Sequence, residues 1–180
     1  MTKEQPLKIV TGLMLLMLCV IVPFVPEAYA SYAALFYPAL FLTLLAAILC
    51  GWLHAFLIGA LVPFLIMVLF RESELIPDVV TESIVLSLSG LTAAVCYNIF
   101  KSALGSVLAG LLLGRIAMAV TNMILYYYMG LSYTIGEFFD DAVLSVWPCL
   151  IACVVGIPIL VALFRKLGVM TVLRHERYER

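Results

Sequence analysis

Arg115 is the residue of this sequence that most clearly requires a chemical explanation. It lies near the middle of an apolar stretch, residues 102–128, that is long enough to cross a bilayer. An unpaired charge at that depth costs several kcal/mol, so the side chain should face the interior of a helical bundle and find a partner there. Two interpretations are open: the guanidinium binds an anionic group of a solute, or it pairs with a carboxylate or with exposed backbone carbonyls of the protein.

Other polar residues share helix faces with Arg115 or stand near it in the predicted bundle. Asn122 follows Arg115 by seven residues and Tyr126 follows four later, so the three form one stripe on a helix. This stripe is the best candidate for a pocket lining, although amides also make ordinary hydrogen bonds between helices. Glu82, about one turn into the run 79–100, shares a face with Ser89. It is either a wall of the same pocket or a carboxylate that reaches water at the headgroups.

Paired acids open the last apolar run of the chain. Asp140 and Asp141 could do acid–base chemistry or bind a cation, but capping of the helix N-terminus and interaction with the helix dipole explain them more simply. Asp141, Ser145 and Cys149 recur at intervals of four residues, so that face could still contact a ligand.

An aromatic residue and two thiols follow in the same run. Trp147, about two turns in, is the preferred candidate for stacking on a ring-bearing solute. Cys149 and Cys153 have helical spacing, but no histidine lies nearby in sequence, and we expect neither a metal site nor a cofactor.

The elements that hold these residues are predicted to be membrane-spanning helices. The chain has 180 residues, of which 66% are hydrophobic and 12% charged, and its mean hydropathy is +1.19. A water-soluble domain of this size could not bury so many apolar side chains. We therefore predict an all-α polytopic membrane protein with one transmembrane domain. Its six spans are expected at residues 7–25, 38–51, 52–70, 79–100, 102–128 and 140–164.

The distribution of charge predicts how the spans are oriented. With the N-terminus inside, eight basic residues fall on the cytoplasmic side and only Arg71 falls outside, as the positive-inside rule requires. Both termini are then cytoplasmic, in the cell membrane. The first span could alternatively be a cleaved signal peptide, because residues 28–30 match a small-x-small site. The eight basic residues are Lys3, Lys8, Lys101, Arg165, Lys166, Arg174, Arg177 and Arg180.

Composition also excludes several functions. The net charge of −1 argues against a nucleic-acid partner. The sequence holds no GxxxxGK[ST] phosphate-binding loop, so it carries no recognisable ATP-driven motor. We expect the protein not to be an enzyme, with a small membrane enzyme using Asp140 and Asp141, or a structural subunit of an envelope complex, as alternatives.

Several short motifs follow one another along the chain in a characteristic order. They are Tyr37-Pro38-Ala39, Cys50-Gly51-Trp52, residues 59–65, Pro77, residues 90–97, Gly114-Arg115-Ile116, Trp147-Pro148 and Gly156-Ile157-Pro158. Their order and spacing resemble a known family, the substrate-binding (S) component of energy-coupling-factor (ECF) vitamin transporters. This resemblance implies a six-helix fold with a solute site on its outer side, and partners comprising a transmembrane coupling subunit and two ATPases. The solute would be a vitamin or vitamin precursor, with riboflavin-, pantothenate- and pyrimidine-like molecules all compatible.

Overall fold

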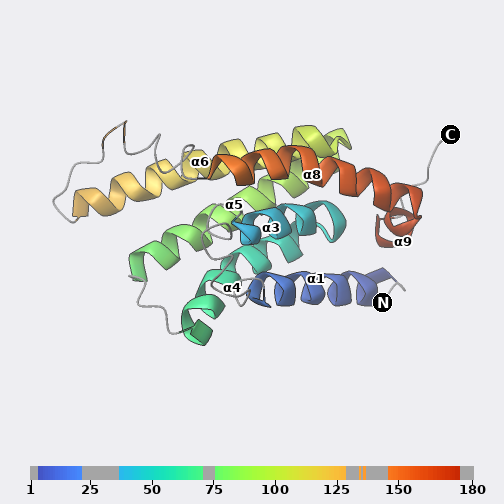
Figure 1. Cartoon of the computed structure of the whole chain (residues 1–180), viewed down its shortest axis with the longest axis horizontal. Coiled ribbons are helices and arrows are strands. Elements are labelled where there is room, and N and C mark those ends of the chain that lie inside the picture. The colour runs from blue at the N-terminus through green and yellow to red at the C-terminus, as the bar shows by residue number, and fades with distance from the viewer. Residues whose placement is uncertain are drawn as a thin grey trace.

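The computed structural model describes residues 4–21, 37–70, 76–128, 134, 136 and 146–174. Within these ranges every regular secondary-structure element is a helix, as the sequence predicts (Figure 1). They are α1 (Glu4–Ile21), α3 (Pro38–Leu49), α4 (Trp52–Phe70), α5 (Ile76–Phe100), α6 (Ala103–Tyr128), α8 (Trp147–Lys166) and α9 (Val169–Arg174).

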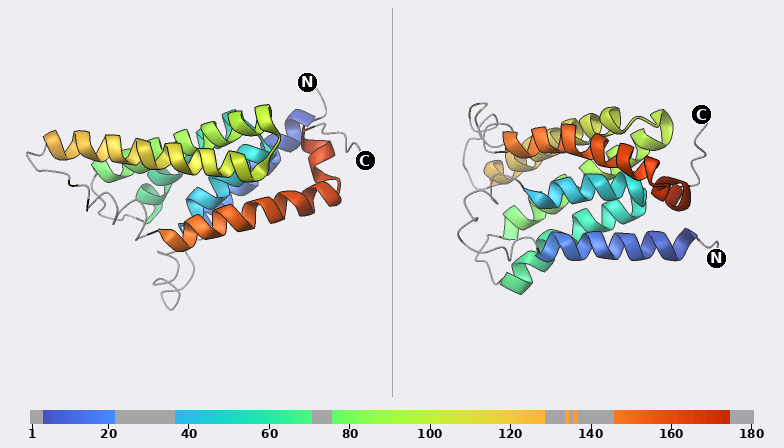
Figure 2. Two further views of the ribbon diagram at one scale, coloured as in Figure 1. Left: turned by 90° about the horizontal axis from the view of Figure 1, so that it is seen from above. Right: turned by 45° about the vertical axis from the view of Figure 1, so that its right-hand side comes forward.

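Helix α3 is the centre of the bundle. It contacts α1, α4, α5, α6, α8 and α9, and nine of its twelve residues are buried. Apart from Thr43 its residues are all apolar, which is typical of a helix that is surrounded by protein. The views from two further directions agree that the longer helices run beside and around α3 (Figure 2).

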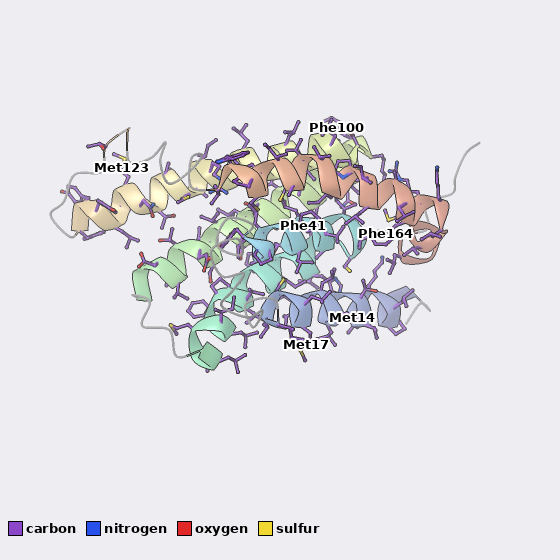
Figure 3. All side chains as sticks on the ribbon, in the orientation of Figure 1. Met14, Met17, Phe41, Phe100, Met123 and Phe164 are labelled. Carbon is purple, nitrogen blue, oxygen red and sulfur yellow. The ribbon has the colours of Figure 1, made fainter. Side chains whose placement is uncertain are left out.

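The outer helices carry apolar side chains that face away from the bundle. Met14 and Met17 project outward from α1, whereas Phe41 of α3 lies toward α8, against Gly156 (Figure 3). Exposed large apolar residues also follow α4, α6 and α8. A surface of this extent would be unstable in water and suits contact with lipid tails.

Four helices are long and apolar enough to cross a membrane. They are 18 to 26 residues long over Trp52–Leu69, Asp78–Phe100, Ala103–Tyr128 and Trp147–Lys166. Two further apolar helices, Pro6–Ile21 and Pro38–Leu49, are shorter. The structure therefore supports a helical membrane protein, while the number of spans and the side on which each terminus lies remain predictions.

Small residues allow α5 and α6 to pack closely. Ser106, Gly110 and Gly114 recur every four residues and are all buried on α6. A Cβ atom added at Gly110 would lie 2.7 Å from the carbonyl oxygen of Ser89 on α5. This stripe of small residues serves packing within the bundle, where close approach increases the van der Waals contact that holds helices together in lipid.

At one end of the bundle a basic residue of α8 forms hydrogen bonds with the end of α5 and the residue that follows it. Arg165, in the last turn of α8, donates from Nη2 to the hydroxyl of Tyr97 at 2.8 Å and to the carbonyl oxygen of Lys101 at 3.1 Å. Tyr97 is fully buried. The short helix α9 follows and packs on α1, α3 and α8. The start of α1 and the ends of α5 and α8 therefore lie at the same end of the molecule (Figure 1).

Candidate functional site

Arg115 lies halfway along α6 and is half-buried. The neighbours with which it interacts electrostatically are Tyr37, before α3, and Cys149 and Cys153 on α8. The side chain is therefore directed toward other helices of the bundle, as expected for a charge in an apolar helix. Its one hydrogen bond among the described residues runs from Nη1 to the sulfur of Met118 at 3.5 Å.

Tyr37 connects Arg115 to Glu82. The Tyr37 hydroxyl donates a hydrogen bond to the carboxylate of Glu82 on α5, and the same side chain interacts electrostatically with Arg115 on α6. These three residues come from segments far apart in the sequence. Together they form a cluster of polar side chains, which we call the Tyr37–Glu82–Arg115 cluster.

The backbone around Tyr37 explains why the cluster forms at this level. Pro38 occupies the first turn of α3, where its missing N–H costs nothing, and so fixes the start of the helix. Tyr37 itself adopts a left-handed backbone conformation, with φ of 32°. Conformations of this kind are uncommon outside glycine and concentrate at functional sites.

The cluster lies deep in the bundle because α3 is short. Twelve residues of helix span only about 18 Å, whereas the hydrocarbon core of a bilayer is about 30 Å thick. Gly51, with φ of 100°, joins the end of α3 to the start of α4. Counted from that end, Tyr37 lies about 18 Å along the bundle. Helix α6 begins at the same end of the bundle as α4 (Figure 1), and Arg115 lies twelve residues after its start, so the two residues stand at about the same level.

The two thiols of α8 line the same region. The Sγ atoms of Cys149 and Cys153 are 3.9 Å apart, and the Cys149 thiol lies 3.5 Å from the carbonyl oxygen of Tyr37, to which it donates. This contact gives the Tyr37 carbonyl a partner from α8 and fixes α8 against the start of α3. All five cysteines are free thiols.

Two buried hydroxyls lie on α3 and α5, two of the helices around the cluster. Thr43 Oγ1 on α3 and Ser89 Oγ on α5 have no hydrogen-bond partner within the described part of the chain. Ser89, which is 1% exposed, faces the Cα of Gly114, the residue before Arg115. Buried hydroxyls of this kind usually meet an ordered water or a bound polar group.

The remaining predicted site residues differ in how they relate to the cluster. Asn122 and Tyr126 are half-buried and continue along α6 from Arg115 toward its C-terminus. Trp147 is the first residue of α8 and is 54% exposed, which suits a contact with lipid or an outer loop. Asp141 and Ser145, like Asp140, lie outside the described residues. The structure therefore groups Glu82 with Arg115, through Tyr37, and leaves Trp147 at the surface.

From the sequence, Tyr37 was noted only as part of the Tyr37-Pro38-Ala39 motif and was not expected to belong to the site. A signal was present in the sequence. The apolar run that begins at Pro38 has about 14 residues, fewer than the roughly 20 needed to cross a bilayer. Tyr37, which directly precedes this run, must then lie below the membrane surface.

The described residues offer no metal site, since they contain no group of three or more His, Cys, Asp or Glu side chains placed to hold an ion. Comparison of the chain with family models, with curated proteins and with solved structures gave no match.

Proposed function

We propose that this protein is the membrane-embedded solute-binding subunit of an ECF-type importer, which captures a vitamin or vitamin precursor from outside the cell. A coupling subunit and two ATPases would supply the energy, because the sequence holds no motor motif of its own. In this proposal the chain itself catalyses no reaction.

The observation that carries the proposal is the Tyr37–Glu82–Arg115 cluster at the deep start of α3. Membrane proteins tolerate the end of a helix at that depth only where it is buried in protein or lines a polar cavity. In transporters, interrupted helices and charged residues near the middle of the membrane mark the solute site. Asn122 and Tyr126 would extend this site toward the outside.

The binding role is tested by substituting the arginine of the cluster. The wild-type protein is purified in detergent and examined by native mass spectrometry for a small molecule that co-purifies with it. We expect Arg115→Ala to lose that molecule and to weaken its binding about 100-fold, because removing a buried charge–ligand contact costs about 2–5 kcal/mol.

A matched control is the other half-buried arginine of the described chain. Arg165→Ala removes a guanidinium at the opposite end of the bundle, where it binds Tyr97 and Lys101. This variant should keep the bound molecule. If Arg115→Ala and Arg165→Ala both retain it with unchanged affinity, Arg115 is not part of the site.

The orientation is tested separately. The proposal places both termini in the cytoplasm, so green fluorescent protein fused after Arg180 should fluoresce, and alkaline phosphatase fused there should be inactive. Phosphatase activity at that position would show that the C-terminus is outside, and the solute site would then face the wrong side for uptake.

A membrane enzyme that uses Asp140 and Asp141 gains no support from geometry, because both residues lie outside the described part of the chain. It would be favoured if Asp141→Asn abolished turnover of a bound molecule without changing its affinity.

A further inference from the structure

We infer that the solute carries an anionic group, a carboxylate or a phosphate, which binds Arg115. This inference rests on the solute-binding role proposed above and deepens it. It separates the acidic, pantothenate-like class of solute from neutral riboflavin-like and pyrimidine-like molecules.

The first step is the hydrogen-bonding capacity of Arg115. A guanidinium has five N–H donors and no acceptor. Within the described residues, one of those donors reaches the Met118 sulfur, which is a weak acceptor. No carboxylate of the described chain forms an ion pair with Arg115. Most of the binding capacity of the guanidinium is therefore not used by the residues that the structure describes.

The second step is the state of the nearest acid. Glu82 accepts the hydrogen bond of Tyr37, so its carboxylate is oriented by the phenol and not by the guanidinium. The groups that do interact with Arg115 are a phenol and two thiols, which are ordinarily uncharged at neutral pH. The positive charge at the level of Tyr37 is therefore not neutralised by these neighbours.

The third step is the electrostatic field at the level of Tyr37, where α3 begins. Helix α3 begins here, and the N-terminus of a helix carries a partial positive charge that favours anions. The helix end and the guanidinium therefore act in the same direction. Other basic side chains, such as Lys101, Arg165 and Lys166, lie at the opposite end of α5 and α8 and do not set the charge of this site.

These three steps define the ligand chemistry. A planar guanidinium with unused donors matches the two oxygens of a carboxylate or phosphate, which it can bind through paired hydrogen bonds. A cationic solute would be repelled by both positive features. A neutral solute without an anionic group would leave most donors of Arg115 without a partner among the described residues, in a medium where that is costly.

The test uses pairs of probes that differ only in the charged group. Wild-type protein in detergent is titrated with nicotinate and nicotinamide, with pantothenate and pantothenol, and with pyridoxal phosphate and pyridoxal. Binding is measured by calorimetry, and any co-purified molecule is identified by native mass spectrometry. We expect an acidic probe to bind about 100-fold more tightly than its neutral partner, or the co-purified molecule to be an anion. The identity of the pair distinguishes a carboxylate from a phosphate.

Substitutions then assign the preference to Arg115. Arg115→Gln should abolish the difference between the two members of a pair, whereas Arg165→Gln should preserve it. Because the comparison of paired probes is made on the wild-type protein, the inference stays testable even if Arg115→Gln fails to insert.

Two results would overturn the inference in different ways. If a neutral probe binds as tightly as its acidic partner, or if the co-purified molecule is neutral or cationic, the inference fails and the solute-binding role stands. If no probe binds and no molecule co-purifies, both fail together.

Discussion

The contact of α6 with α5 and α3 leads to a prediction about Gly110. An added Cβ at this position would lie 2.7 Å from the Ser89 carbonyl oxygen, 3.0 Å from Ala93 Cβ and 3.0 Å from Leu44 Cδ2. Ordinary van der Waals contact begins at 3.4 Å. Since one of these atoms belongs to the backbone and the others to buried side chains, Gly110→Ala must push α6 away from both neighbouring helices.

The size of the effect follows from two opposed terms. Replacing glycine by alanine within a helix gains about 1 kcal/mol of helix propensity, whereas overpacking a well-packed core costs about 1–3 kcal/mol and sometimes more. The steric term acts at three contacts here and should dominate. We expect a net loss of roughly 1–2 kcal/mol, which lowers Tm by about 2–8 °C for a chain of this size.

Gly105 on the same helix provides the matched control. Its added Cβ would meet only Ser102, at 3.5 Å and beyond, and the residue is exposed. Gly105→Ala should therefore show the propensity gain alone and raise Tm by about 1–4 °C. Both variants add one methyl group to α6, but Tm should fall for Gly110→Ala and rise for Gly105→Ala.

The assay can use the thiols of the protein itself. Cys19, Cys50, Cys149 and Cys153 are buried, so a maleimide dye that fluoresces on reaction with thiols reports unfolding during a temperature ramp in detergent. The reasoning is refuted if Gly110→Ala is as stable as the wild type or if both variants shift Tm in the same direction. A displaced α6 would also move Arg115, so Gly110→Ala should weaken solute binding as well.

Two further predictions concern the opposite end of the bundle and the thiols. Tyr97→Phe removes the acceptor of the 2.8 Å hydrogen bond from Arg165 and should lower the free energy of unfolding by about 1–3 kcal/mol. Tyr127→Phe, on the exposed side of α6, is the control and should have no effect. Equal stability of the two variants would refute the role of this bond. A membrane-permeant maleimide should modify half-exposed Cys96 in the folded protein well before the two buried thiols of α8. Peptide mapping after short reaction times would measure the order of modification. Faster reaction of the α8 thiols would mean that they are not packed as described.

The sequence indicates the candidate site only in part. Arg115 is a candidate from the sequence alone, because a charge in the middle of an apolar run stands out without any structure. Asn122 and Tyr126 are candidates because their spacing places them on the same face of the helix. Trp147 was expected deep within a span, but it begins α8 and is largely exposed. The error arose because the start of that helix was judged from hydropathy, which does not determine where the first turn begins.

The sequence by itself determined the class of protein and the positions of its long helices, because apolar composition and run length reflect transfer from water to lipid, which each segment undergoes separately. Only the tertiary structure decided that Tyr37 meets Glu82, 45 residues away, and that Cys149 reaches the Tyr37 carbonyl, 112 residues away. Such pairings depend on the order in which helices pack around α3. That order is set by close contacts between small residues and by the length of α3. The periodicity of a single segment does not predict which helices will pack against one another.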